Sequence, residues 1–203
     1  MYGLNEKETD LLMKLDSPRK IQDFLESLKI NFEENGDTCM SPRKVLQEGK
    51  AHCIEGAMLA ALALRLHGEK PLLVDMTSVK KDFDHVIAVF KKHGHWGAIS
   101  KSNHAVLKYR EPVYKNIREL VLSFFHEYFL DNGKKTLRSY SKPVDLSMFD
   151  KKGWVTSEKN VWCIPSYLGK VPHKKIMNRK QISSLRKADD IEIEAGKLVR
   201  WKR

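Results

Sequence analysis

Apolar residues recur at helical spacing along the first fifty residues, and residues that begin or end helices interrupt the pattern. Asn5, Ser17 and Ser41 are capping residues, and each serine is followed by a proline, which suits the first helical position. We therefore expect three helices, the last ending at Gly49. Their apolar faces consist of Leu11, Leu12 and Leu15, then Ile21, Phe24, Leu25 and Leu28, then Val45 and Leu46.

The next helical segment, residues 53–64, is apolar on all sides rather than along one stripe. A helix with this pattern is buried on every face. It begins at Cys53, directly after a turn at residues 49–52, and His67-Gly68 provides its end. The sequence thus predicts a central helix with a cysteine in its first turn.

Beyond this helix the pattern changes to short apolar runs that are typical of strands. Residues 71–76 and 85–90 predict two buried strands, and residues 95–100 predict a third. A turn at residues 91–94, with Gly94 at its end, joins the last two strands into an antiparallel hairpin.

A helix is expected at residues 112–130, and Asn132-Gly133 provides its end. Its apolar face consists of Ile117, Leu120, Val121, Phe124, Phe125 and Phe129. Periodicity then weakens. We expect short strands at residues 161–164 and 191–194, the second of which turns into residues 198–201.

These elements predict an α+β fold, in which the central helix that carries the cysteine packs on an antiparallel sheet. A C-terminal β-rich extension is expected to follow. One domain over residues 1–203 is predicted, with its core at about residues 17–130 and a basic extension at residues 131–203 packed on it.

Composition favours a globular protein, because 203 residues with 41% hydrophobic positions are enough for one packed core. No apolar run approaches the roughly 20 residues of a membrane span, and the polar start is unlike a signal peptide. We therefore expect a soluble, cytoplasmic protein that does not bind membranes. Cys39, Cys53 and Cys163 are too widely separated to indicate a disulfide framework, a metal site or another cofactor site.

The net charge of +11 is concentrated near the C-terminus. Residues 170–203 contain eleven Lys/Arg and four Asp/Glu, which is +7 and leaves +4 for the preceding 169 residues. Such an excess favours an anionic partner, which makes nucleic acid one candidate. The competing interpretation is a solubilising surface, since no RNA-binding signature accompanies the charge.

Cys53 and His85 are the residues whose positions indicate chemistry. A cysteine in the first turn of a helix meets the positive end of the helix dipole and free N–H groups, and both favour the thiolate. His85 stands at the entrance of the strand at residues 85–90. An imidazole beside the thiol would complete a nucleophile and its base.

The order of these parts resembles the transglutaminase-like domain, a relative of the papain-like cysteine proteases. The resemblance rests on residues 49–57 (GKAHCIEGA) around the cysteine, and on residues 84–86 (DHV) and 94–96 (GHW) of the hairpin. It covers residues 17–102. It implies a papain-like core and thiol acyl transfer on peptide or protein amides by a Cys, His, Asp triad, without a cofactor.

The third member of that triad is where the chain departs from the family. The aspartate is expected four residues after Trp96, where this chain has Ser100. Alternation along the hairpin places Ser100 on the same face as His85. Asn103 and Asp84 are the alternatives, although Asn103 needs a bulge to reach that face and Asp84 points to the opposite side as a direct neighbour of His85.

Three functions are therefore open. The first is cysteine-dependent acyl transfer or amide hydrolysis with Cys53 as nucleophile, His85 as base, and Ser100 or Asn103 orienting the ring. The second is an inactive scaffold of the same fold that binds a peptide or a polyanion. The third is a nucleic-acid-binding protein, for which the basic C-terminal region is the only support.

Other polar and aromatic residues have simpler interpretations. His52 is within reach of the thiol but is expected to be a loop residue, and Gln47 is expected to lie in a helix rather than in an oxyanion hole. His93 and His95 are expected to be solvated turn residues rather than metal ligands. Core packing is the interpretation for Trp154, Trp162 and Tyr167.

Overall fold

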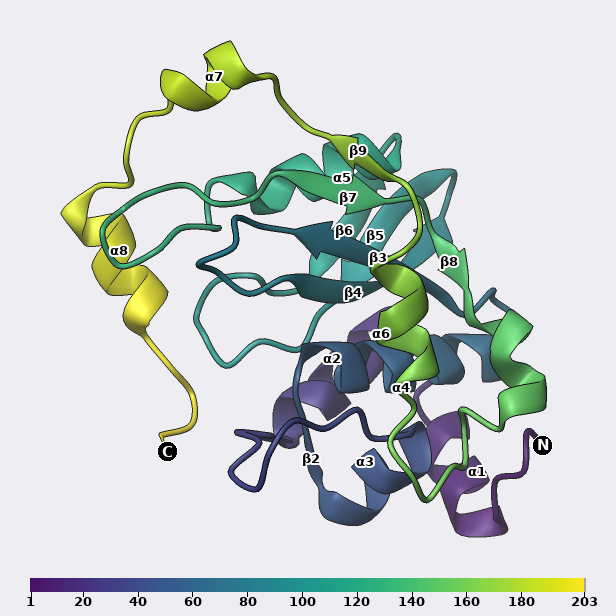
Figure 1. The fold of residues 1–203 in the computed structure, drawn as a ribbon. Helices are drawn as coiled ribbons and strands as arrows, with labels where there is room; N and C mark the ends of the chain where they lie inside the picture. Colours follow the sequence, from purple (N-terminus) through teal and green to yellow (C-terminus); the bar gives the residue numbers. More distant parts are fainter. Residues whose placement is uncertain (203) are drawn as a thin grey trace.

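The computed structural model describes residues 1–202, and its N-terminal third is helical (Figure 1). Three helices begin where the sequence predicts, because the side chains of Asn5, Ser17 and Ser41 each accept the N–H of the residue three positions on. These helices are α1 (Glu6–Met13), α2 (Pro18–Ser27) and α3 (Pro42–Glu48).

A short parallel pair of strands, β1 (Lys29–Ile30) and β2 (Lys50–Ala51), leads into the central helix α4 (Cys53–Leu66). The chain can turn sharply between α3 and β2 because Gly49 adopts a left-handed conformation with φ of 63°. Every residue of α4 from Ile54 to Leu64 is buried. The prediction of a central buried helix headed by Cys53 is therefore confirmed.

The larger sheet has the strand order β6-β5-β4-β3-β7-β9, and its pairings are antiparallel. Its main strands are β3 (Leu72–Thr77), β4 (His85–Lys92), β5 (His95–Ile99) and β6 (Arg110–Tyr114). The short strands β7 (Ser139–Ser141), β8 (Val144–Asp145) and β9 (His173–Lys175) extend it on the side of β3, where β8 pairs with β3 off the main path. The predicted α+β class with a helix on an antiparallel sheet is confirmed.

The turn of the β4–β5 hairpin falls within the predicted residues 91–94 and consists of two residues, since Lys92 pairs with His95. His93 and Gly94 both have positive φ, at 50° and 82°. Turns with this geometry match the twist of the strands that they join. The hairpin register is thereby set, with Ala88 opposite Ile99.

The sheet separates two hydrophobic clusters, and successive residues of its strands alternate between them. Val86, Ala88 and Phe90 of β4 pack on the side of α4, with α1, α2 and α3 beyond. Ile87 and Val89 pack on the other side, which α5 (Ile117–Phe125) covers (Figure 1).

The helix expected at residues 112–130 is shorter than predicted. Residues 110–114 form β6 instead, at the end of the strand order, where Pro112 is tolerated because an edge strand need not donate every N–H. Asn116 caps α5 by accepting the N–H of Glu119, and the helix ends at Phe125.

The prediction of a β-rich C-terminal extension is wrong, since helical segments outnumber the short strands there. They are the 3-10 helix η1 (Leu146–Lys152), α6 (Cys163–Leu168), α7 (Arg179–Ser183) and α8 (Asp190–Lys197). The strand expected at 161–164 is absent, because Cys163 and Ile164 belong to α6, whose Pro165 lies in the first turn, where its missing N–H has no intrahelical role. The strand expected at 191–194 lies within α8, because Glu192 accepts the N–H of Asp189 in a capping box.

From β9 the chain runs outward through α7 and returns through α8 to the edge of the central body (Figure 1). Its last residues dock on the loop after β5, where Ala105 donates to the carbonyl of Leu198 and Arg200 donates to that of Asn103. Among the described helices, none has the length and apolar character needed to cross a membrane.

Candidate active site

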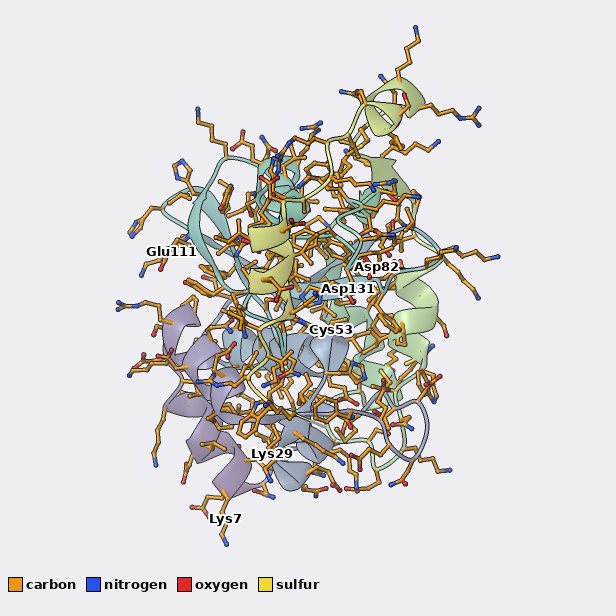
Figure 2. The ribbon with its side chains drawn as sticks, turned by 90° about the vertical axis from the view of Figure 1, so that its left-hand side faces the viewer. Lys7, Lys29, Cys53, Asp82, Glu111 and Asp131 are labelled. Carbon is orange, nitrogen blue, oxygen red and sulfur yellow. The ribbon has the colours of Figure 1, made fainter. Side chains whose placement is uncertain are left out.

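Cys53 lies at the start of α4, half-buried, in the wall of a cleft of about 590 Å³. The cleft is also lined by residues of the β3–β4 loop, the loop after β5, the segment after α5, and α8. Asp82 and Asp131 lie in this lining, and Figure 2 shows both near Cys53 with α8 beside them. The only thiol in the cleft lining is thus presented at a helix N-terminus, where a thiolate is favoured.

His85 is buried at the start of β4, and its orientation is determined by Ser100. The Nε2 atom of His85 lies 2.8 Å from the Ser100 hydroxyl, and that hydroxyl lies 2.6 Å from the carbonyl oxygen of Leu107. A carbonyl only accepts hydrogen bonds, so the Ser100 hydroxyl donates to Leu107 and accepts from Nε2–H of His85. This assignment leaves Nδ1 of His85 for the exchange of a proton with Cys53.

Leu107 has a strained backbone conformation that contacts with neighbouring residues stabilise. Its φ of 60° is unusual for a residue with a branched side chain, and strain of this kind costs about 1–3 kcal/mol. The backbone N–H of Leu107 donates to the Glu127 carboxylate over 2.9 Å, and Glu127 forms an ion pair with Arg110. This support directs the Leu107 carbonyl at Ser100.

Two imidazoles, those of His52 and His85, act on the thiol of Cys53. Burial by itself raises the pKa of a thiol, but hydrogen bonds from His52 and His85, together with their positive charge, lower the pKa of Cys53 to about 5. The thiolate is therefore the main form near neutral pH.

His52, expected to be a loop residue, instead contacts the thiol and is surrounded by acceptors on its other side. Its Nε2 atom lies 3.1 Å from the carbonyl oxygen of Thr38, 3.5 Å from Oε1 of Glu33 and 3.4 Å from Oε1 of Glu55. Burial disfavours the charged ring, yet the contacts with Cys53 and Glu55 raise the pKa of His52 to about 9. The sequence signal for this arrangement is Glu55 three residues after His52, the spacing of a capping box.

The two alternative third residues, Asn103 and Asp84, also line the cleft, but their side chains bind other partners than His85. The side chain of Asn103 exchanges two hydrogen bonds of 2.9 Å with the backbone of Trp201. Asp84 is exposed and accepts the N–H of Ser78 over 2.8 Å. Ser100, and not these residues, therefore holds the ring of His85.

The remaining sequence candidates are found outside the cleft lining. Gln47 is exposed on α3 and His93 lies in the hairpin turn, as expected, whereas His95 is the first residue of β5 and is partly exposed. Trp154 is fully buried, as expected, whereas Trp162 has 45% of its surface exposed. Tyr167 packs edge-on against Phe149.

Lys101, the residue after Ser100, is a buried cation that caps a helix. Its Nζ atom donates to the carbonyls of Leu25 and Leu28 at the end of α2, over 2.7 and 2.6 Å, and only 2% of its surface is exposed. Burial lowers the pKa of Lys101 to about 8. An unfolded chain holds this proton up to a pH of about 10.4.

This difference makes folding stability depend on pH. Between pH 8 and about 10.4 the unfolded chain binds a proton that the folded protein has released, so stability rises with pH in this window. We expect the free energy of unfolding to gain roughly 3 kcal/mol across it, at about 1.4 kcal/mol per pKa unit, relative to Lys101→Met. Urea unfolding at several pH values between 7 and 11 measures the gain. The exposed Lys174→Met on β9 is the control, and parallel curves for wild type and Lys101→Met would contradict the prediction.

The site thus combines a thiolate, an imidazole that Ser100 orients and a second imidazole beside carboxylates, in an open cleft. Such a set supports nucleophilic attack and proton transfer.

Within residues 1–202, no group of three or more His, Cys, Asp or Glu has the arrangement of a metal site. No model of a known protein family matches the chain, and no curated protein matches it either.

Proposed function

We propose that the protein is a cysteine-dependent amide hydrolase or acyltransferase with a core of the transglutaminase-like type. Cys53 attacks the carbonyl carbon of a peptide or protein amide, after its proton has passed to Nδ1 of His85. His85 gives this proton to the departing amine as the C–N bond breaks, which leaves a thioester on Cys53. Water, or a second amine, then attacks the thioester through His85 and restores the thiol.

The observation that carries this proposal is the juxtaposition of Cys53 with a His85 ring whose tautomer is set by Ser100. Nucleophile, base and orienting group come from α4, β4 and the end of β5, and they meet at one cleft. This is the spatial arrangement that acyl-transfer chemistry requires. The N–H of Cys53 lies in the first turn of α4, so it is free of intrahelical bonding and is the candidate donor to the oxyanion.

Alkylation of the three cysteines with iodoacetamide tests the proposal within one chain. Cys53 is expected to react first, with a rate that already reaches its plateau near pH 7, because the reactive thiolate dominates above its pKa of about 5. Cys39 is the internal control, since it is fully buried and burial raises its pKa. Peptide mass spectrometry after short exposures between pH 4 and 10 gives the rate at each thiol.

A labelling rate for Cys53 that rises only around pH 8–9, as for an ordinary thiol, would contradict the proposal.

That result would support the second candidate function, an inactive scaffold that binds a peptide or a polyanion. Two observations favour this candidate: Ser100 is neutral where a triad carboxylate is expected, and residues 170–187 contain seven Lys/Arg and no Asp/Glu. Binding to a polyanion through this segment would weaken as salt is added.

A further inference from the structure

We propose that the thiolate–imidazolium pair of this site is stabilised at its thiolate end, by a protonated His52 held against Glu55, instead of at its His85 end by a carboxylate. The inference rests on the proposed function and deepens it, because it explains how the site operates with Ser100 in the third position. His52 keeps its proton throughout, and His85 takes and returns the proton of Cys53.

The ring of His52 is held by acceptors that select its protonated form. Thr38, Glu33 and Glu55 place three oxygens within 3.5 Å of Nε2, so this nitrogen carries a hydrogen. These contacts leave Nδ1 for the hydrogen bond with Cys53. A ring that donates from both nitrogens is an imidazolium, and its charge lies directly beside the sulfur.

Glu55 is a buried side chain that accepts several hydrogen bonds. Its side chain is fully buried and receives the N–H of His52 over 3.0 Å, the N–H of Met40 over 2.8 Å and the hydroxyl of Thr38 over 2.8 Å. Asn31 adds a further donor at 3.1 Å. These donors fix the position of the Glu55 carboxyl group, whose Oε1 lies 3.4 Å from Nε2 of His52.

The two imidazoles that contact Cys53 differ in their surroundings. Among the described residues, His52 and His173 have a carboxylate oxygen within 4 Å of a ring nitrogen, and His85 does not. A hydroxyl sets the tautomer of His85 but contributes no charge to an imidazolium. The carboxyl groups of Glu33 and Glu55 therefore act on the Cys53 thiolate through His52, and not through His85.

The test compares His52→Gln with His104→Gln, since His104 also lines the cleft but bonds the carbonyl of Gly196. We expect His52→Gln to slow iodoacetamide labelling of Cys53 at pH 6 by about tenfold, the change for a rise of the Cys53 pKa from about 5 to about 7, with an unchanged rate at pH 10. His104→Gln should match wild type at both pH values. Labelling of His52→Gln that follows the wild-type profile would overturn the inference.

Two further measurements keep the inference separate from folding and from catalysis. Glu33→Gln removes one carboxylate without touching the buried Glu55, and it should shift the labelling profile in the same direction by a smaller amount. NMR titration of the His52 ring should show its proton retained above pH 8 in wild type and released at a lower pH in Cys53→Ala, because the thiolate is one of the groups that raise the pKa of His52. A ring that titrates near pH 6.5 in wild type would overturn the inference even if the protein is an active hydrolase. A wild type with a low Cys53 pKa but no acyl turnover would instead contradict the proposed function and leave the inference standing.

Discussion

His85→Ala is expected to separate formation of the acyl-enzyme from its breakdown. The probe is p-nitrophenyl acetate, whose leaving group departs without a proton. Acylation of Cys53 therefore continues and gives a burst of one p-nitrophenolate per site. Hydrolysis of the thioester needs a base to activate water, so the steady-state rate should fall by about 10²–10⁴-fold. Stopped-flow absorbance measures the burst and the steady rate in one trace.

The control for this prediction is His104→Ala, which removes another imidazole from the same cleft. It should keep both the burst and the steady rate of wild type, because His104 bonds the backbone of Gly196 at 2.8 Å. Cys53→Ala should show neither phase. A His85→Ala variant that turns over at the wild-type rate would rule out His85 as the base.

Gly56→Ala is expected to produce a large loss of stability through a single methyl group. A Cβ atom on Gly56 would lie 2.6 Å from Cβ of Lys101, an atom next to the backbone that cannot move independently. Overpacking of this kind costs up to about 3 kcal/mol, and helix propensity returns about 1 kcal/mol. We expect the free energy of unfolding to fall by about 2 kcal/mol, which corresponds to roughly 4–8 °C in the thermal midpoint.

The matched control is Gly169→Ala at the end of α6. Gly169 has φ of −67°, and an added Cβ there would lie 3.6 Å from its nearest neighbour, which is ordinary contact. Thermal unfolding followed by circular dichroism should give wild-type stability for Gly169→Ala. Equal midpoints for the two variants would show that α4 and Lys101 are not packed as tightly as described.

Most of the hairpin part of the site could be predicted from sequence because its geometry is local. Once His93 and Gly94 form a two-residue turn, the pairing of every residue along β4 and β5 follows. Alternation of side chains then places Ser100 on the face of His85, and the two are 2.8 Å apart. The cap at the start of α4 is equally local, which is why Cys53 could be placed in its first turn.

The secondary-structure predictions that are wrong concern segments whose short residue pattern is compatible with both a helix and a strand. Ile191 to Glu194 alternate as in a strand, but Asp189 and Glu192 form a capping box that begins α8. Pro112 suits the first turn of a helix, yet it lies in the edge strand β6. The deciding contact for α8 is local, since its two residues lie three positions apart, whereas β6 forms by pairing with β5, a partner that residues 110–114 do not specify.

The sequence by itself determined the central helix, the hairpin and the position of Cys53, because helix caps, periodicity and a tight turn act over a few residues. Only the tertiary structure decided that His52 faces Cys53 with Glu33 and Glu55 behind it, and that Leu107 accepts from Ser100. Contacts such as that of His52 with Glu33 join residues from different segments. They form only when the segments pack, because closing the intervening chain costs conformational entropy. Burial of the packed segments offsets this entropy, and no local conformational preference does.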